Sequence, residues 1–385
     1  MLLGFRKDAL KAFSPAIISD SLDADTLDAS VIRWDCGFRE YDSVDVARAL
    51  VLILSRLPGL NSIQAASKPW YRPAHHLEPS FGSSPSPLAK DYERLAVPGC
   101  MGRLTSLYSR LIKRSFRRRF LMAKMTKVPV VGQAMEFAFF EDDDIIILPK
   151  DEVAKEVLRG RTIDVGIEAR PENIVLPSQV VEHFVRRSRY IYLMNKCMCR
   201  DANECNSYPR DLGCIFLGRG VLRIPEGMGR MVSAEEAIDH LRRCREAGLV
   251  HLIGRDKIDA VWLGVGGKEN LLSICSCCEC CCLWKMLPNL NNSINATVTR
   301  MPGVEVLVHE DLCVGCGTCV DSKACYIDAI SMKEGRASID LGLCKGCGRC
   351  VPVCPSGAIE LKIDDSDFLQ RTIERIDPLV DIEGR

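Results

Sequence analysis

The feature that most restricts how this chain can fold is the spacing of its cysteines. Of the 21 cysteines in 385 residues, 19 lie between Cys197 and Cys354, and many of these are only two or three residues apart. Neighbours this close rarely suit a single disulfide framework, whereas thiolates at such spacings can converge on one inorganic cluster. The pattern therefore predicts metal–sulfur chemistry in the second half of the chain, and the isolated Cys36, Cys100 and Cys244 are expected to be small buried apolar residues.

Charge and hydropathy favour a reducing, cytoplasmic and anaerobic setting. Lys plus Arg equals Asp plus Glu, at 51 each, so the chain as a whole has no electrostatic attraction to nucleic acid or to an anionic membrane. The N-terminal residues 1–7 lack the long apolar core of a secretory signal. No stretch reaches the roughly 18 apolar residues of a membrane span, so we expect no transmembrane segment.

Residues 304–363 contain two similar cysteine runs, each followed by an Ala-Ile pair and a short expected strand. The second run reads C-x2-C-x2-C-x3-C-P from Cys344 to Pro355, and the first begins C-x2-C-x2-C at Cys313 and continues to Cys325. Three closely spaced cysteines allow one tight loop to surround three corners of a cubane, and glycines beside them let the backbone turn sharply. Zinc bound by C-x2-C pairs would not explain three-cysteine runs with a remote fourth cysteine.

These runs resemble the bacterial-type ferredoxin family that carries two [4Fe–4S] clusters. In that family the fourth cysteine of each run ligates the other cluster. The resemblance therefore implies that one cubane is held by Cys313, Cys316, Cys319 and Cys354, and the other by Cys325, Cys344, Cys347 and Cys350. The chain departs from the family in one place, because five residues separate Cys319 from Cys325 and Tyr326 stands where the family has proline.

Two further cysteine-rich loops precede the ferredoxin-like region. The first contains Cys197, Cys199, Cys205 and Cys214, and the second contains Cys275, Cys277, Cys278, Cys280, Cys281 and Cys282. Each loop follows an expected strand, at 190–193 and at 271–274, so we expect the two loops to meet. Adjacent cysteines point in different directions, so the second loop cannot direct all six thiols to one cubane. Three interpretations stay open: one additional [4Fe–4S] cluster with ligands from both loops, two additional clusters or one non-cubane cluster, and a zinc site or redox-active thiol pair.

A second, broader resemblance covers about residues 170–363. A C-x-C-R loop at 197–200, a Glu-Ala-Gly-Leu-Val-His segment at 246–251 and an Ile-Cys-x-Cys-Cys run at 274–278 are similar to a larger family of anaerobe 4Fe–4S ferredoxin-type proteins. The resemblance implies iron–sulfur chemistry without naming a reaction.

The periodicity predicts an α+β fold with a mixed N-terminal region, a central helix–strand domain and a β-α-β-β-α-β-like ferredoxin module. The expected divisions are an N-terminal segment with a helix at 43–56 and a linker (1–90), a basic helix and mixed region (91–170), a central cysteine-rich domain (171–300), the ferredoxin module (301–365), and a C-terminal helix with a candidate tag remnant (366–385). Helices are expected after Pro177 and from Ser233 to Gly248, and a hairpin is expected over 260–274.

The basic helix expected at 103–124 has apolar residues on one face and five Lys or Arg residues on the other. It either packs with a solvated basic face or docks on a membrane surface or a partner.

Three functions compete: an electron-transfer protein or subunit that serves redox partner proteins, an oxidoreductase with an active iron–sulfur or thiol site within 197–282, and a redox-sensing regulator. The mixed charge of helix 234–247 argues against DNA binding, and no nucleotide-binding motif occurs. The sequence favours electron transfer and leaves enzymatic activity open.

Overall fold

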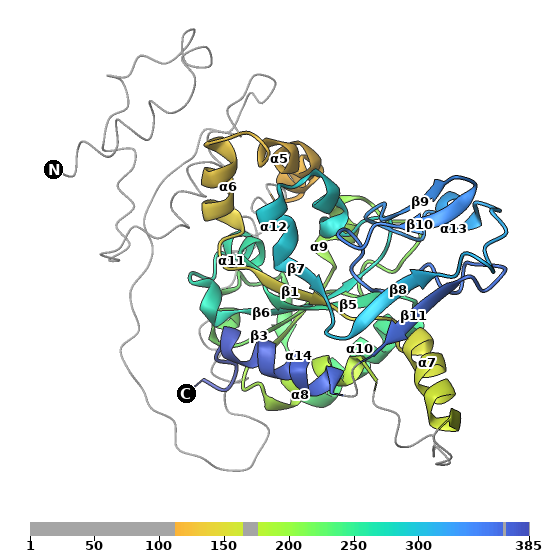
Figure 1. The fold of residues 1–385 in the computed structure, drawn as a ribbon. Helices are drawn as coiled ribbons and strands as arrows, with labels where there is room; N and C mark the ends of the chain where they lie inside the picture. The colour runs from red at the N-terminus through yellow and green to blue at the C-terminus, as the bar shows by residue number, and fades with distance from the viewer. Residues whose placement is uncertain (1–111, 165–175, 365–366, 385) are drawn as a thin grey trace, which may run out of the picture.

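The structure, a computed structural model, describes residues 112–164, 176–364 and 367–384, with the side chains of 159–164 excepted. The expected N-terminal segment, its helix at 43–56 and the linker lie outside the described residues, as does the first part of the expected basic helix. Helices and strands of mixed pairing alternate through the rest of the chain, so the fold is α+β as predicted (Figure 1).

A seven-stranded sheet forms the centre of the described chain. Its spatial order is β4-β2-β3-β6-β5-β1-β7, and all neighbours pair antiparallel except β1 and β7, which are parallel. The strands are β1 (Asp144–Ile147), β2 (Ile191–Met194), β3 (Ile215–Leu217), β4 (Gly229–Met231), β5 (Val250–Arg255), β6 (Leu272–Cys277) and β7 (Val298–Arg300). The strand expected at 190–193 is thus present as β2, shifted by one residue.

Helices cover both faces of this sheet, because alternate residues of each strand point to opposite sides. Ile146 and Ile253 pack with α8 and α10 on one side, whereas Ile147 and Leu252 pack with α6, α11 and η6 on the other. The helices are α5 (Arg119–Met125), α6 (Val131–Phe139), α7 (Asp151–Asp164), α8 (Ser178–Arg187), α9 (Met198–Ala202), α10 (Ala234–Glu246), α11 (Lys257–Leu263), α12 (Asn292–Thr297) and α14 (Phe368–Ile376), with 3-10 turns η4 (Arg219–Arg223), η5 (Lys268–Asn270), η6 (Leu283–Asn289) and η7 (Asp377–Leu379).

The ends of α10 are those that its sequence predicts. Ser233 accepts a hydrogen bond from the Glu236 amide at 3.2 Å, which satisfies one of the free donors of the first turn. Gly248, with φ of 78°, follows the last turn in the left-handed conformation that terminates many helices.

The hairpin expected over 260–274 is wrong in its first strand. Residues 257–263 form α11 instead. Asp256 caps its N-terminus by accepting a hydrogen bond from the Ile258 amide, and Gly264 terminates it in the left-handed conformation. A short apolar run is compatible with a buried helix as well as with a strand, so periodicity alone could not distinguish the two. The capping residues at both ends favour the helix. Strand β6 in turn extends to Cys277, so that Cys275 and Cys277 lie on the strand itself.

The basic helix packs on the central sheet region. Residues 112–117 are helical, a turn at Arg118 interrupts the helix, and α5 follows. Arg119 is buried with its guanidinium 4.2 Å from the ring centre of Phe116, and two basic side chains pair with residues at the end of α9 (Lys113 with Asp201, Arg117 with Glu204). In the described part of the chain, no helix has the length and apolarity to cross a membrane.

The ferredoxin-like module lies beside β7 and α7 (Figure 1). Strand β8 (Val304–Val308) pairs antiparallel with β11 (Ile359–Ile363), and β9 (Ile330–Lys333) pairs antiparallel with β10 (Arg336–Ile339). Helix α13 (Thr318–Asp321) follows the first cysteine run, whereas the second expected helix is replaced by turns at residues 349–353.

Candidate iron–sulfur centres

The first ferredoxin set consists of Cys313, Cys316, Cys319 and Cys354. These four residues line a hollow of about 290 Å³ together with Pro355 and other residues of the module. Cys316 is exposed and Cys319 is buried, so the hollow lies at the surface of the molecule. The Ala337 amide lies 3.4 Å from Cys313 Sγ and the Thr318 hydroxyl lies 3.4 Å from Cys316 Sγ. Donors aimed at sulfur stabilise a negatively charged cluster, so this set fits a [4Fe–4S] group.

The second ferredoxin set consists of Cys325, Cys344, Cys347 and Cys350. Burial, with the nearby thiols of Cys344 and Cys325, raises the pKa of Cys350, and burial raises that of Cys347 to about 11. The Ala329 amide donates to Cys325 Sγ at 3.3 Å. The longer loop after Cys319 therefore does not prevent Cys325 from reaching the other three thiols. Buried thiols with raised pKa values lose their protons readily only to a metal centre.

The six-thiol set combines both central loops: Cys197, Cys199, Cys214, Cys275, Cys277 and Cys282. Hydrogen bonds join Cys197 to Cys199 and Cys214, Cys214 to Cys275, and Cys277 to Cys282. Strand β2 ends just before Cys197, β3 begins just after Cys214, and Cys275 and Cys277 lie on β6, which pairs with β3. The sheet order thus brings the two loops together.

Hydrogen bonds between the thiols of the six-thiol set shift their pKa values in opposite directions. Hydrogen bonds from Cys199 and Cys214 hold the pKa of Cys197 well below its usual value, and the hydrogen bond from Cys277 lowers that of Cys282. The same bonds raise the pKa values of Cys199 and Cys277. A thiolate rather than a thiol ligates metal, so the members of this set that hold a cluster would lose their protons on binding it.

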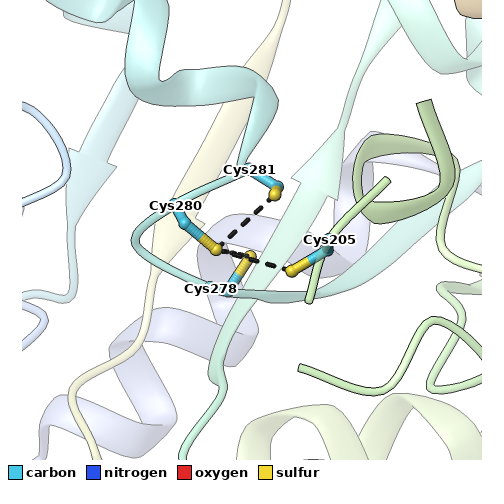
Figure 2. Close-up of side chains that lie close together, drawn as sticks. All are labelled: Cys205, Cys278, Cys280 and Cys281. Carbon is cyan, nitrogen blue, oxygen red and sulfur yellow. Dashed lines mark hydrogen bonds between the residues drawn. The ribbon is translucent and has the colours of Figure 1, made fainter. Parts of the chain in front are cut away.

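The four-thiol set consists of Cys205, Cys278, Cys280 and Cys281. Their sulfur atoms all lie within 4.8 Å of one another. Cys280 Sγ is 3.6 Å from Cys205 Sγ and 3.5 Å from the sulfurs of both Cys278 and Cys281 (Figure 2). Cys205, Cys278 and Cys281 are buried. A turn at residues 279–281 brings the thiols of Cys278, Cys280 and Cys281 to Cys205, whereas the thiol of Cys282 lies with the six-thiol set.

Arg200 lies between the two central sets. It is fully buried and donates to the backbone carbonyls of Ser276, at 2.8 Å, and Leu212. Burial lowers its pKa, but the thiolates of Cys197 and Cys214 and those farther along β6 raise it above the usual value. A buried guanidinium needs nearby negative charge, so this residue balances anionic sulfur in both sets.

Arg349 joins the ferredoxin module to the central domain. It lies between Cys347 and Cys350 in the chain, and its guanidinium contacts Glu279 Oε2 at 2.6 Å and the Cys277 carbonyl at 2.5 Å. Tyr208 donates its hydroxyl to the same carboxylate at 2.9 Å. Arg349 is only 8% exposed and the Glu279 side chain is 27% exposed, so this is a partly buried charge pair between the second ferredoxin loop and the central cysteine loop.

Tyr326 occupies the space between the second ferredoxin set and the six-thiol set. Burial raises its pKa well above the usual value, and the neighbouring sulfurs of Cys282 and Cys347 raise it further. Its hydroxyl is buried without a hydrogen-bond partner among the described residues. A buried hydroxyl with no partner is costly, and a sulfur atom of a bound cluster would supply the missing acceptor.

The structure thus places all eighteen predicted cysteines in four sets. Cys244, expected to be an apolar residue, is fully buried beside the four-thiol set. Sequence reasoning missed Arg349, Glu279, Tyr208 and Arg119 as neighbours of these sets. An arginine inside a C-x2-C run was the available signal for Arg349, but its partners come from 70 residues earlier in the chain.

Comparison with protein families finds a 4Fe-4S binding domain at residues 337–360, which covers the second cysteine run. Comparisons with curated proteins and with solved structures give no significant match. The chain therefore contains a ferredoxin-type module, and this module and the cysteine sets indicate an iron–sulfur electron-transfer role.

Proposed function

We propose that this protein passes single electrons between redox partner proteins through two ferredoxin-type [4Fe–4S] clusters and at least one further cluster in the six-thiol set, in a reducing compartment such as the cytoplasm. Cys313, Cys316, Cys319 and Cys354 would hold the first cluster, Cys325, Cys344, Cys347 and Cys350 would hold the second, and the six-thiol set would supply the ligands of the third. Such clusters, when bound, accept and release one electron at a time.

The observation that carries the proposal is the order of the thiol sets through the molecule. The first ferredoxin set opens to the surface at Cys316. The second ferredoxin set follows inside the same module, and Tyr326 separates it from the six-thiol set. A partner docked at the exposed set would therefore exchange electrons with the buried central set through the module.

The residues of the chain fix this arrangement. Arg349 and Glu279 hold the second ferredoxin loop against the central loop. Lys345 donates to Asn295 Oδ1 at 2.9 Å, and the Lys150 amide donates to the Cys347 carbonyl at 3.2 Å, which adds two further contacts between module and central domain. Cys197 and Cys282 of the six-thiol set are buried, and the lower local polarity strengthens charge interactions around them.

Iron and acid-labile sulfide should be quantified in protein purified without oxygen, with electron paramagnetic resonance of the reduced form. About twelve irons per chain are expected for three clusters, against about eight for the ferredoxin module alone. Cys199→Ser and Cys277→Ser, made separately, should each lower the count to about eight. Cys244→Ser, a buried cysteine outside all four sets, is the matched control and should retain the full count. Colourless, iron-free protein would refute the proposal.

A second candidate is an oxidoreductase with its active site at the six-thiol set. The observation that favours it is a hollow of about 190 Å³ that reaches Cys275 and is lined by Asp256, Ser273 and Trp284. Six thiols also exceed the four ligands of a cubane. Perturbation of the central electron paramagnetic resonance signal by small thiols or other sulfur ligands would support this candidate, and an inert signal would oppose it.

A further inference from the structure

The sulfur–sulfur distances in the four-thiol set are shorter than those between the ligands of a cubane. Its closest sulfur pairs are 3.5 to 3.6 Å apart, and all four sulfurs lie within 4.8 Å of one another. Four thiolates around one zinc ion, at Zn–S distances of about 2.3 Å, stand about 3.8 Å apart in a tetrahedron. The four cysteines of a cubane bind four different irons and therefore stand farther apart than the four ligands of a single ion.

The surroundings of the four-thiol set suit a closed metal site. Backbone amides of Ser207 and Tyr208 donate to Cys205, and the Cys281 amide donates to Cys278. Such N–H···S contacts stabilise metal-bound thiolates and orient them. Arg210 donates to the Cys205 carbonyl at 3.0 Å, and buried Arg200 lies close enough to Cys278 to offset thiolate charge.

We propose that Cys205, Cys278, Cys280 and Cys281 bind a single structural zinc ion, separate from the iron–sulfur clusters. The site offers four cysteine ligands from the protein, which is the ligand set of structural rather than catalytic zinc. The proposal does not depend on the redox role of the molecule, because it concerns four thiols that the electron-transfer proposal does not use.

The position of this site suggests that the ion fixes the position of Glu279. Glu279 lies between two of its ligands in the chain and accepts hydrogen bonds from Tyr208 and Arg349. The ion ties the segment after α9, at Cys205, to the turn that presents Glu279. It therefore holds the carboxylate that anchors the second ferredoxin loop, and with it the spacing between module and central domain.

The test is metal analysis of the anaerobically purified full chain, expressed with both iron and zinc in the medium. About one zinc per chain is expected, and zinc-edge X-ray absorption should show four sulfur neighbours at about 2.3 Å. Cys280→Ser should lose the zinc and keep all the iron, whereas Cys244→Ser should keep both metals. The unfolding midpoint of the Cys280 variant should fall, and Arg349→Ala should then lower it little further.

A loss of about four irons in Cys280→Ser would mean a cubane at this set and would overturn the proposal. Wild-type protein without zinc, with one iron at this set, or with zinc coordinated by oxygen or nitrogen would overturn it as well. The X-ray absorption measurement needs only the wild-type chain, so the proposal stays testable if the serine variant fails to fold. Iron-free protein that still carries zinc on four sulfurs would refute the electron-transfer proposal and support this one.

Discussion

The ferredoxin module and the central domain organise their cysteines in opposite ways. In the module, two short loops each place three cysteines around one centre, and each fourth cysteine comes from the other half of the module. In the central domain, consecutive residues separate: Cys281 joins the four-thiol set and Cys282 joins the six-thiol set. Regular spacing thus specifies the first arrangement locally, whereas strand pairing specifies the second.

The largest expected effect is the loss of iron caused by Cys344→Ser in the second ferredoxin set. This variant should lose about four of about twelve irons, while the central signal in electron paramagnetic resonance persists. Reduction of the central signal by an external electron donor should become much slower, because the intermediate step is missing. Loss of the central signal in the same variant would show that the two regions assemble as one unit, which would contradict the distinction drawn here between module and central domain.

Arg349→Ala removes one partner of a partly buried charge pair at the junction. Glu279, whose side chain is 27% exposed, would keep its hydrogen bond from Tyr208, so we expect a loss of about 1–3 kcal/mol in unfolding free energy. Anaerobic denaturant titration measures the change. Arg117→Ala, at an exposed ion pair with Glu204, is the control and should leave stability unchanged within error. Equal effects of the two substitutions would contradict the junction described here.

Gly346→Ala tests how closely the second ferredoxin loop packs against β7 of the central sheet and β8 of the module. The residue has φ of 68°, and an added Cβ would lie 3.1 Å from the side chains of Arg300 and Val304. We expect a loss of about 1–3 kcal/mol in unfolding free energy. Gly357→Ala is matched in backbone conformation, with φ of 67°, but its Cβ would meet no atom within 4 Å. A larger loss for Gly357→Ala would be inconsistent with close packing at Gly346.

Tyr326→Phe should have the smallest effect on stability. The hydroxyl has no hydrogen-bond partner in the part of the chain that the structure describes, so its removal should change the unfolding free energy by less than about 1 kcal/mol. If the hydroxyl donates to a sulfur of a bound cluster, the variant should have a more negative reduction potential, since a donor stabilises the reduced form. A redox titration followed by electron paramagnetic resonance measures the shift. An unchanged potential would show that Tyr326 only fills space.

Much of the fold could be predicted where local signals agree. Ser233 and Gly248 define the ends of α10 because capping depends on residues within one turn. The same logic failed at residues 260–265, where an apolar run without clear periodicity fits both helix and strand. The burial of Arg119 was also unpredictable, because it depends on the packing of α5 against η6, which lies more than 150 residues later in the chain.

By itself the sequence determined that this chain carries metal–sulfur chemistry and that its C-terminal region contains a ferredoxin-type module, because close cysteine spacing limits what one short loop can surround. Only the tertiary structure decided how the ten central cysteines divide, and that Arg349 meets Glu279. Those contacts join residues about 70 positions apart, and the pairing of β3, β6 and β5 sets their distances. A local sequence pattern cannot predict contacts between residues that are brought together by the order of strands in a sheet.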